Sequence, residues 1–307
     1  MKPRLVAWGE RFFYAPSSFQ RLLAYALWPL GALYCFIMHR RYQNSVPRHQ
    51  GIPVVSVGNL TVGGSGKTPL TVALAQRQAN PAVVLRGYGR QSSGLQVVSD
   101  GSSVLCDVAC SGDEAMLYAL ELPHAVVIVS EDREAGIAKA KAMGCGCVFL
   151  DDGYGKHFIA KYDIVIDVAA ANGFCLPAGP FRERLWPGKE VRLVREGVDF
   201  TRRVTIRDAA PKMALVTAIA RPERLDPFLP EVVAKSTFPD HHFFARDELV
   251  SILEQSGADA LLVTYKDYVK IRHFDLPLAL MELHLELDDA LAADVEHYIR
   301  TYDENKD

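Results

Sequence analysis

Apolar residues gather in short, nearly continuous runs through the middle of the chain, and segments with helical spacing separate these runs. Continuous apolar runs are typical of parallel strands that are covered on both faces. The runs predict strands at 52–57, 82–85, 124–130, 147–150 and 162–168. The segments between them predict helices at 67–78, 113–120 and 131–143. We therefore predict an α/β fold built on a doubly wound, mostly parallel sheet.

The pattern changes after residue 190. Charged and β-prone residues alternate over 191–208, which we interpret as part of a two-stranded linker at 191–210. A second αβ series follows, with strands at 212–216, 260–264 and 276–287 and helices at 248–255 and 289–302. We therefore expect an N-terminal helical segment at 1–45, a larger domain at 46–190, the linker, and a smaller α/β domain at 211–307.

The longest apolar stretch lies near the N-terminus. Residues 22–38 carry no formal charge and are flanked by Arg21 and by His39-Arg40-Arg41. Such a length is at the lower limit for a membrane span. Pro29 and Gly31 interrupt the stretch, so an interfacial anchor and a buried core helix stay open as alternatives. We expect a membrane helix, with the rest of the chain on the cytoplasmic, positively flanked side.

The composition fits a globular protein with well-formed cores. The 307 residues are 49% hydrophobic with a net charge of −3, which argues against a nucleic-acid partner. The spacing of the cysteines matches neither a secreted disulfide scaffold nor a zinc module, so we expect reduced thiols. These cysteines are Cys35, Cys106, Cys110, Cys145, Cys147 and Cys175.

A glycine-rich segment, VGNLTVGGSGKTPL at 57–70, joins the first predicted strand to its helix. Backbone N–H groups in such a loop surround phosphates, the lysine reaches the terminal phosphates, and the threonine hydroxyl can bind Mg²⁺. The strict nucleotide-binding pattern fails at Thr61, and an ordinary βα turn that holds a lysine is the alternative. We predict a triphosphate site formed by Gly63, Gly64, Ser65, Gly66, Lys67 and Thr68.

Two acidic pairs stand near predicted element ends. Asp151-Asp152 ends an apolar strand, where carboxylates can reach a metal held by Thr68. Asp113-Glu114 begins a predicted helix, where an aspartate can cap the helix or accept a proton from an attacking hydroxyl. The residues alone leave these two roles for Asp113 open.

Basic residues follow several strands. Arg86 projects from the sheet edge where open α/β folds bind ligands, and Arg133 and Arg182 lie in comparable loops. In the second domain, Asp240 precedes His241, and such a pair can relay a proton.

Taken together, these segments resemble the tetraacyldisaccharide 4'-kinase family, the lipid A disaccharide kinases of Gram-negative bacteria. The resemblance covers nearly the whole chain and includes VGNLTVGGSGKTP, RGYGR, GDE, Asp151-Asp152, LPAGPFRE, IARPERL, FPDHH and VTYKDYVK, in order. It implies a P-loop NTPase-type kinase domain and a smaller α/β domain joined by a two-stranded linker. It also implies transfer of the ATP γ-phosphate, with Mg²⁺, to the 4'-hydroxyl of an acylated glucosamine disaccharide 1-phosphate at the inner membrane.

The resemblance also implies roles for individual residues. Asp113 is the expected base, His241 pairs with Asp240, and Lys67 acts on the phosphates. The expected metal ligands are Thr68, Glu114, Asp151 and Asp152. The expected contacts to the lipid disaccharide are Arg86, Tyr88, Arg133, Arg182 and Glu183.

The chain departs from the family pattern at two places. DDGFQH appears as DDGYGKH at 151–157, with an extra residue before His157, and TEKD appears as TYKD at 264–267. A catalytically impaired homologue is therefore one alternative. A membrane-associated P-loop GTPase or metallochaperone is another, although the segment nearest to a guanine-reading tetrapeptide, TYKD, lacks the asparagine.

Overall fold

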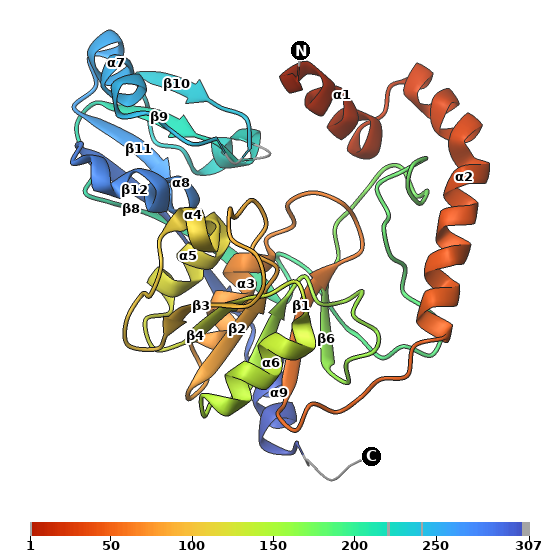
Figure 1. Cartoon of the computed structure of the whole chain (residues 1–307). Coiled ribbons are helices and arrows are strands. Elements are labelled where there is room, and N and C mark those ends of the chain that lie inside the picture. Colours follow the sequence, from red (N-terminus) through yellow and green to blue (C-terminus); the bar gives the residue numbers. More distant parts are fainter. Residues whose placement is uncertain (1, 220–221, 241, 303–307) are drawn as a thin grey trace.

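The computed structural model describes residues 2–219, 222–240 and 242–302, which form two α/β units and an N-terminal helical arm (Figure 1). The first unit is built on a seven-stranded sheet of order β3-β4-β2-β5-β1-β6-β7. Among these strands, β3 is antiparallel to its neighbour and the other pairs are parallel. The strands are β1 (Val54–Asn59), β2 (Pro81–Leu85), β3 (Gln96–Asp100), β4 (Val126–Val129), β5 (Cys147–Asp151), β6 (Tyr162–Ile166) and β7 (Arg192–Val194).

Helices cover both faces of this sheet, as the continuous apolar runs predict. Val55 and Val57 pack into a core with α3 and α5, whereas Val54 packs on the other face with α6. Successive residues of a strand point to opposite faces, so a strand that is covered on both sides is apolar at every position. The helices are α3 (Lys67–Ala75), α4 (Val108–Ser111), α5 (Asp113–Glu121) and α6 (Arg133–Ala142). The predicted doubly wound α/β fold is confirmed.

The second unit has a five-stranded sheet of order β10-β9-β11-β12-β8, in which β8 runs antiparallel to β12. Its strands are β8 (Phe200–Arg207), β9 (Met213–Thr217), β10 (Ala234–Thr237), β11 (Ala260–Thr264) and β12 (Leu278–Leu287). Its helical segments are η1 (Pro222–Phe228), α7 (Arg246–Ser256), α8 (Tyr265–Ile271) and η2 (Arg272–Phe274).

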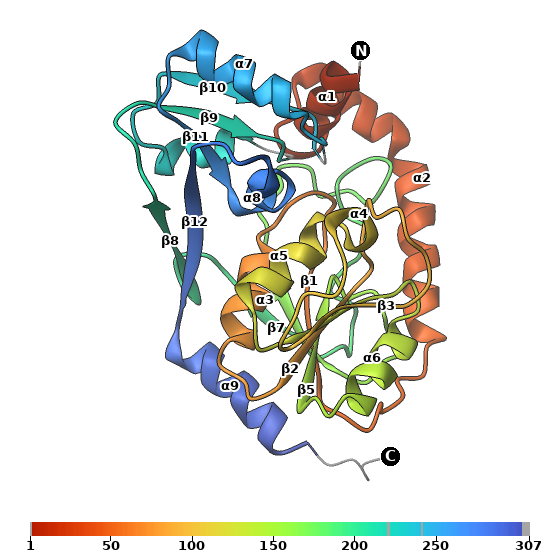
Figure 2. The same cartoon turned by 60° about the vertical axis from the view of Figure 1, so that its left-hand side comes forward.

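A ribbon of two long strands connects the units. Strands β8 and β12 pair from Leu280 opposite Arg207 to Leu287 opposite Phe200, and Figure 2 shows them running from the second unit toward the first. The final helix, α9 (Asp289–Arg300), then packs on the first sheet, where Leu291 and Val295 join the core around α3. The last helix of the chain therefore completes the first unit.

This connection differs from the predicted linker at 191–210. Strand β7 pairs with β6 in the first sheet, and the partner of β8 is β12, some eighty residues later in the sequence. The alternation of β8 shows that one face is covered, but strand pairing depends on tertiary contacts that the local pattern does not contain. The sequence reading also missed the edge strands β3 and β10 and the short helix α8.

The arm consists of α1 (Lys2–Tyr14) and α2 (Ser18–Gln43), and α2 lies along the first unit (Figure 1). Gly31 permits a close approach, because a Cβ there would lie 2.8 Å from the carbonyl oxygen of Cys175. Along the same helix, the Tyr34 hydroxyl donates to the carbonyl of Arg182 at 3.3 Å, and His39 stacks on Trp186. One face of α2 is thus attached to the globular body.

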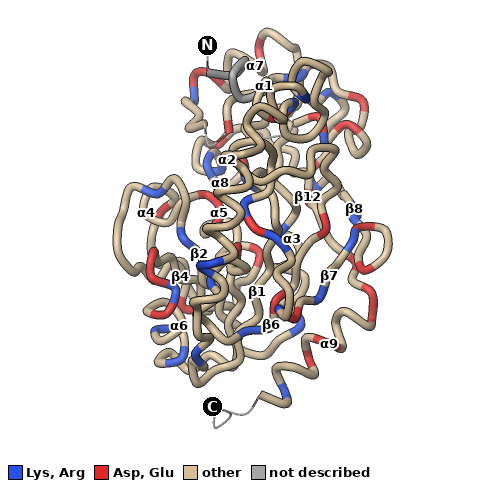
Figure 3. The backbone as a smooth tube through the Cα atoms, turned by 90° about the vertical axis from the view of Figure 1, so that its right-hand side faces the viewer, with Lys and Arg blue, Asp and Glu red and all other residues tan. Residues whose placement is uncertain are grey.

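The remainder of α2 is apolar and exposed. The side chains of Phe19, Leu22, Trp28, Leu33 and Phe36 are each more than half exposed. The sequence of α2 has no Lys, Arg, Asp or Glu between Arg21 and Arg40, and most of the α2 tube is tan in Figure 3. By length and hydropathy α2 is a candidate membrane segment among the described residues.

The packing of α9 predicts that its apolar face stabilises the first unit. Leu291 is fully buried, and replacing a buried leucine by alanine removes apolar contact and leaves a cavity, so Leu291→Ala is expected to lower the free energy of unfolding by about 2–5 kcal/mol. Denaturant unfolding in detergent checks this. The control is Glu296→Ala, which removes only a half-exposed ion pair with Arg77 and should cost below about 1 kcal/mol. Equal effects of the two variants would contradict this packing.

Candidate functional site

The glycine-rich loop leaves β1 at the carboxyl edge of the first sheet and enters α3 at Lys67. Gly63 and Gly66 have φ values of +89° and +86°, which favour glycine. The N–H groups of residues 63–66 donate to no other described residue, and the buried Ser65 hydroxyl also has no partner in that part of the chain. The loop therefore presents several unused donors beside a helix N-terminus, which is the arrangement that binds phosphate.

Lys67 is held by groups from two neighbouring segments. Its ammonium donates to Asn59 Oδ1 at 3.2 Å and lies 3.7 Å from Asp152. The Arg182 guanidinium contacts both oxygens of Asp152, with Nη1 at 2.7 Å from Oδ2, and also donates to Asn59 at 2.9 Å. The lysine and the arginine thus meet at one carboxylate at the mouth of the loop.

The carboxylates of Asp151, the last residue of β5, and of Asp152 differ in the direction of their pKa shifts. Burial, together with the nearby Glu114, raises the pKa of Asp151 to about 7. Burial acts to raise the pKa of Asp152, but the hydrogen bond from Arg182 and the charge of Lys67 outweigh it, so the pKa is lowered. The environment therefore favours a proton or a cation at Asp151 and a bare carboxylate at Asp152.

The residues around Asp151 fit a Mg²⁺ ion. Asp151 Oδ1 is buried and has no hydrogen-bond partner among the described residues. A divalent cation would satisfy this oxygen and relieve its repulsion with Glu114, and all the nearby ligands, including the Thr68 hydroxyl, are the oxygen donors that Mg²⁺ prefers.

A cavity of about 720 Å³ opens above these groups, between the two units. It contains nearly all the residues that the sequence singles out. Those that line it are Gly63, Gly64, Ser65, Gly66, Lys67, Thr68, Arg86, Tyr88, Glu114, Arg133, Asp151, Asp152, Arg182 and Asp240. His241 lies outside the described residues.

Asp113 is the first residue of α5 and does not line the cavity. Its carboxylate is 95% buried and lies 3.7 Å from the ammonium groups of both Lys266 and Lys270, which belong to α8 of the second unit. Lys266 also pairs with Asp240 at 3.1 Å. Burial acts to lower the pKa of Lys266, but the charges of Asp113 and Asp240 prevail and raise it. Asp113 thus joins the first unit to α8 of the second unit through ion pairs.

Glu183 does not stand at the cavity where a contact to the substrate was predicted. It does not line the cavity, and its carboxylate accepts from Trp186 Nε1 at 2.9 Å and lies 3.4 Å from His157. Because His39 of α2 stacks on Trp186, Glu183 connects the arm to the loop that carries Arg182.

Four basic residues that the sequence reading gave no role also line the cavity: Lys156, Arg202, Arg224 and Lys266. Arg224 donates to the carbonyl of Gly64 at 2.6 Å, and Arg202 Nη2 lies 2.9 Å from where a Cβ on Gly66 would be. Arg224 and Lys266 belong to the segments IARPERL and VTYKDYVK, so the resemblance contained their signal. Arg202 reaches the cavity because β8 pairs with β12, and the sequence does not reveal this pairing.

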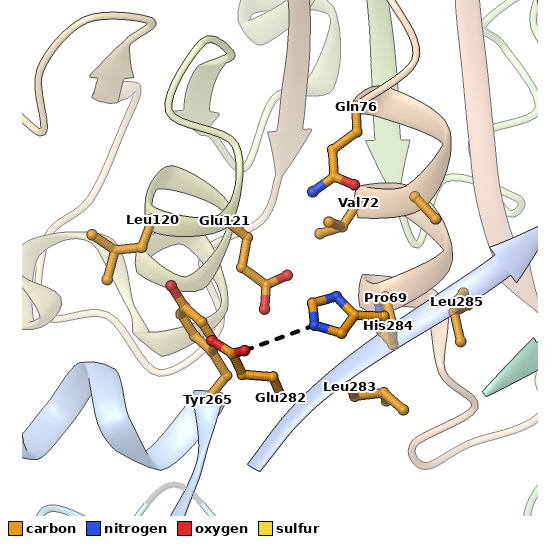
Figure 4. A pocket seen from close by; sticks show the side chains of 11 residues that line it. Pro69, Val72, Gln76, Leu120, Glu121, Tyr265, Glu282, Leu283, His284 and Leu285 are labelled. Carbon is orange, nitrogen blue, oxygen red and sulfur yellow. Dashed lines mark ion pairs between the residues drawn. The ribbon is translucent and has the colours of Figure 1, made fainter. Parts of the chain in front are cut away.

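A second, smaller cavity of about 250 Å³ lies between α3, α5 and β12 (Figure 4). Figure 4 shows the Glu121 carboxyl in the same space as Tyr265, Glu282 and His284. Burial, with the charge of Glu282 adding to it, raises the pKa of Glu121 to about 7. Glu282 pairs with Arg207 at 2.9 Å and lies 3.8 Å from His284 Nε2, and among the described residues no cationic group lies within 4.0 Å of the Glu121 carboxyl.

The fold and the phosphate loop, together with the acidic strand end, define a P-loop nucleotide-dependent enzyme of the α/β class. The model of one such family, Tetraacyldisaccharide-1-P 4'-kinase, matches residues 23–300. The chain belongs to this family.

Similar proteins agree with this membership. A tetraacyldisaccharide 4'-kinase of Aliarcobacter butzleri (strain RM4018) is 41% identical, and the match covers 94% of this chain and 95% of the relative. One of Helicobacter pylori (strain ATCC 700392 / 26695) is 42% identical over 96% of both chains. The fold is similar to the crystal structure of the "apo" form of LpxK from Aquifex aeolicus in complex with ATP, with a TM-score of 0.70, 23% identity, and coverage of 90% of this chain and 99% of that one.

The raised pKa of Glu121 predicts a pH-dependent stability. A glutamate titrates near pH 4.3 in an unfolded chain, so between about pH 4.3 and 7 the folded protein keeps a proton that the unfolded chain loses. The free energy of unfolding should therefore fall as the pH rises through this window. Glu121→Gln should remove this contribution and stabilise the protein at about pH 8 by on the order of 2 kcal/mol, with little effect at about pH 4.

Unfolding at the two pH values checks this, with the exposed Glu254→Gln on α7 as the control for loss of one negative charge. If Glu121→Gln retains the wild-type pH dependence, Glu121 is not the group responsible.

Proposed function

We propose that the protein is an ATP- and Mg²⁺-dependent kinase that transfers the γ-phosphate to the 4'-hydroxyl of a tetraacyldisaccharide 1-phosphate in lipid A biosynthesis. The observation that supports this proposal best is the cavity of about 720 Å³ between the units. The phosphate loop, the Asp151-Asp152 pair and basic side chains from both units all line it. Phosphoryl transfer requires positioning and neutralisation of charge more than covalent chemistry, and this cavity supplies both.

In this proposal the loop N–H groups and Lys67 bind the triphosphate. Arg182 keeps Asp152 in contact with Lys67, which fixes the lysine at the loop mouth. Thr68, Asp151, Asp152 and Glu114 would hold Mg²⁺, which when bound neutralises phosphate charge. Arg224 and Arg202, which reach the loop from the second unit, lie where they can add positive charge to bound phosphates.

Asp113 is the proposed general base, as the family resemblance implies. Lys266 lines the cavity and pairs with both Asp113 and Asp240. Its ammonium would contact the acceptor molecule. We propose that Asp113 accepts the proton of the acceptor hydroxyl, and that Lys266 and Lys270 orient its carboxylate.

The GTPase alternative loses its nearest sequence feature in this structure. Asp267 of the TYKD segment is fully buried, and it accepts hydrogen bonds from the hydroxyls of Thr217 and Thr264, each at 2.8 Å. A carboxylate committed to these interior groups is not placed to read a guanine base. The segment serves instead to begin α8, which presents Lys266 and Lys270 to Asp113.

We further propose that the protein works at the cytoplasmic face of the inner membrane, with α2 lying in the interface. The contacts of Gly31, Tyr34 and His39 attach one face of α2 to the body along several turns. A helix attached in this way does not cross a bilayer while the body stays in water. Its exposed apolar face suits insertion among lipid headgroups and acyl chains.

One assay tests the proposed activity. Purified protein in detergent, incubated with labelled ATP, Mg²⁺ and the acylated disaccharide 1-phosphate, should produce labelled lipid, and labelled GTP should not support the reaction. Asp113→Asn should lower turnover at least about a hundredfold, because the base is lost, while ATP binding persists. Asp275→Asn, which changes an exposed aspartate that does not line the cavity, is the control. Wild-type protein that binds ATP but labels no lipid would favour an impaired homologue, and normal turnover by Asp113→Asn would reject the base assignment.

The interfacial helix makes a separate prediction. The double variant Leu33→Glu/Phe36→Glu places two charges on the exposed apolar face, so the protein should shift from the membrane fraction toward a salt-released fraction. Flotation with anionic vesicles after a salt wash measures this. Val233→Glu changes an equally exposed apolar residue of the second unit and should leave membrane retention unaltered. Full retention of the double variant would be incompatible with insertion of this face.

A further inference from the structure

The N-terminal arm reaches the glycine-rich loop at Val62. The hydroxyl of Tyr14, the last residue of α1, donates a hydrogen bond to the carbonyl of Val62. The N–H of Val62 in turn donates to the carbonyl of Pro180 at 2.9 Å. Both backbone hydrogen-bonding groups of the residue that precedes Gly63 are thus engaged by segments outside the loop.

The contact at Val62 also fixes the direction of the next N–H group. The carbonyl of Val62 and the N–H of Gly63 belong to one planar trans peptide, so they point in opposite directions. A donor that holds the carbonyl therefore directs this N–H away from the arm. The N–H of Gly63 donates to no other described residue, and Gly63 lines the large cavity. Tyr14 thus orients a donor that is available to a phosphate.

Glycine makes this part of the backbone easy to rotate. Gly63 has a φ value of +89°, and a Cβ on Gly64 would meet nothing within 4 Å. Glycine adopts both signs of φ at similar cost, so the loop sequence alone does not fix the direction of its N–H groups. Hydrogen bonds from outside supply this constraint. Arg224 acts in the same way, because its contact to the carbonyl of Gly64 fixes the peptide that contains the Ser65 N–H.

The turn between α1 and α2 holds Tyr14 in place. Trp8 stacks on the buried Phe12, with ring centroids 5.4 Å apart. Gln20 Nε2 donates to the carbonyl of Trp8 at 3.2 Å, and the side chains of Gln20 and Ser17 form a capping box at the start of α2. These contacts hold α1 against the start of α2. A hydroxyl on a helix that is already fixed loses little conformational freedom when it makes its hydrogen bond.

We propose that Tyr14 is a positioning residue for the nucleotide, which holds the Val62 peptide so that the Gly63 N–H donates to a phosphate. Tyr14 does not line the cavity, so it acts on the nucleotide only through the loop. This inference rests on the proposed function, because it takes the loop as the site of the ATP phosphates. It gives the N-terminal arm a part in nucleotide binding in addition to its proposed place at the membrane.

The test compares two variants that each remove one hydroxyl from the arm. Tyr14→Phe removes the donor to Val62, whereas Tyr25→Phe changes a tyrosine of α2 that is 66% exposed. Equilibrium binding of ATP with Mg²⁺, and of adenosine, is measured with the full chain in detergent. Tyr14→Phe should weaken ATP binding about threefold to tenfold, because the loop loses one hydrogen bond that orients its phosphate donors. Tyr25→Phe should bind ATP as the wild type does.

Adenosine and the acceptor distinguish positioning from a purely structural role. Adenosine has no phosphate, so Tyr14→Phe should bind it with wild-type affinity. In steady-state assays KM for ATP should rise by a similar factor, while KM for the acceptor stays unchanged. If Tyr14 only attaches the arm, Tyr14→Phe should keep its ATP affinity and lose acceptor affinity or membrane retention. That result, or an equal loss of affinity for ATP and adenosine, would overturn the proposal.

Measuring both binding and transfer separates this inference from the proposed function. If wild-type protein binds ATP but transfers no phosphate, the kinase proposal fails, while weaker ATP binding by Tyr14→Phe still supports the positioning role. If transfer is normal and both tyrosine variants bind ATP equally well, the positioning role alone fails.

Discussion

The contact between the Arg182 guanidinium and the Asp152 carboxylate joins three parts of the molecule that are distant in sequence. Asp152 follows β5 and lies beside Lys67 of the phosphate loop, while the carbonyl of Arg182 accepts from Tyr34 of α2. An arginine fork matches a carboxylate in geometry, and loss of one partner would leave the other poorly compensated. The position of Lys67 therefore depends on the same loop that holds the N-terminal arm to the body.

Carboxylates offset the positive charge in the large cavity. Near the loop, lysines and arginines are paired with carboxylates, so much of the positive charge is neutralised within the protein. Toward α6, burial lowers the pKa of Arg133, and the charges of Asp151 and Asp152 act to raise it.

The sequence predicted the sheet of the first unit well, because strands covered on both faces leave a strong local signal. The sequence also located the phosphate loop and Asp151-Asp152, because both lie at the ends of predicted strands. The pairing of β8 with β12 and the return of α9 depend on contacts between distant segments, which no local pattern records. For the same reason, the position of Asp113 beside Lys266 and Lys270 could not be read from the sequence, although each residue stood in a recognisable segment.

The return of α9 to the first sheet has a consequence for how the protein is made. During synthesis from the N-terminus, α2 and the phosphate loop leave the ribosome long before Leu291 and Val295 exist. Until then, the sheet face that these residues later cover is open to water, while the apolar face of α2 is already available to lipid. The core of the first unit therefore closes only when the end of the chain has been made, so this unit folds while the exposed apolar face of α2 is already present.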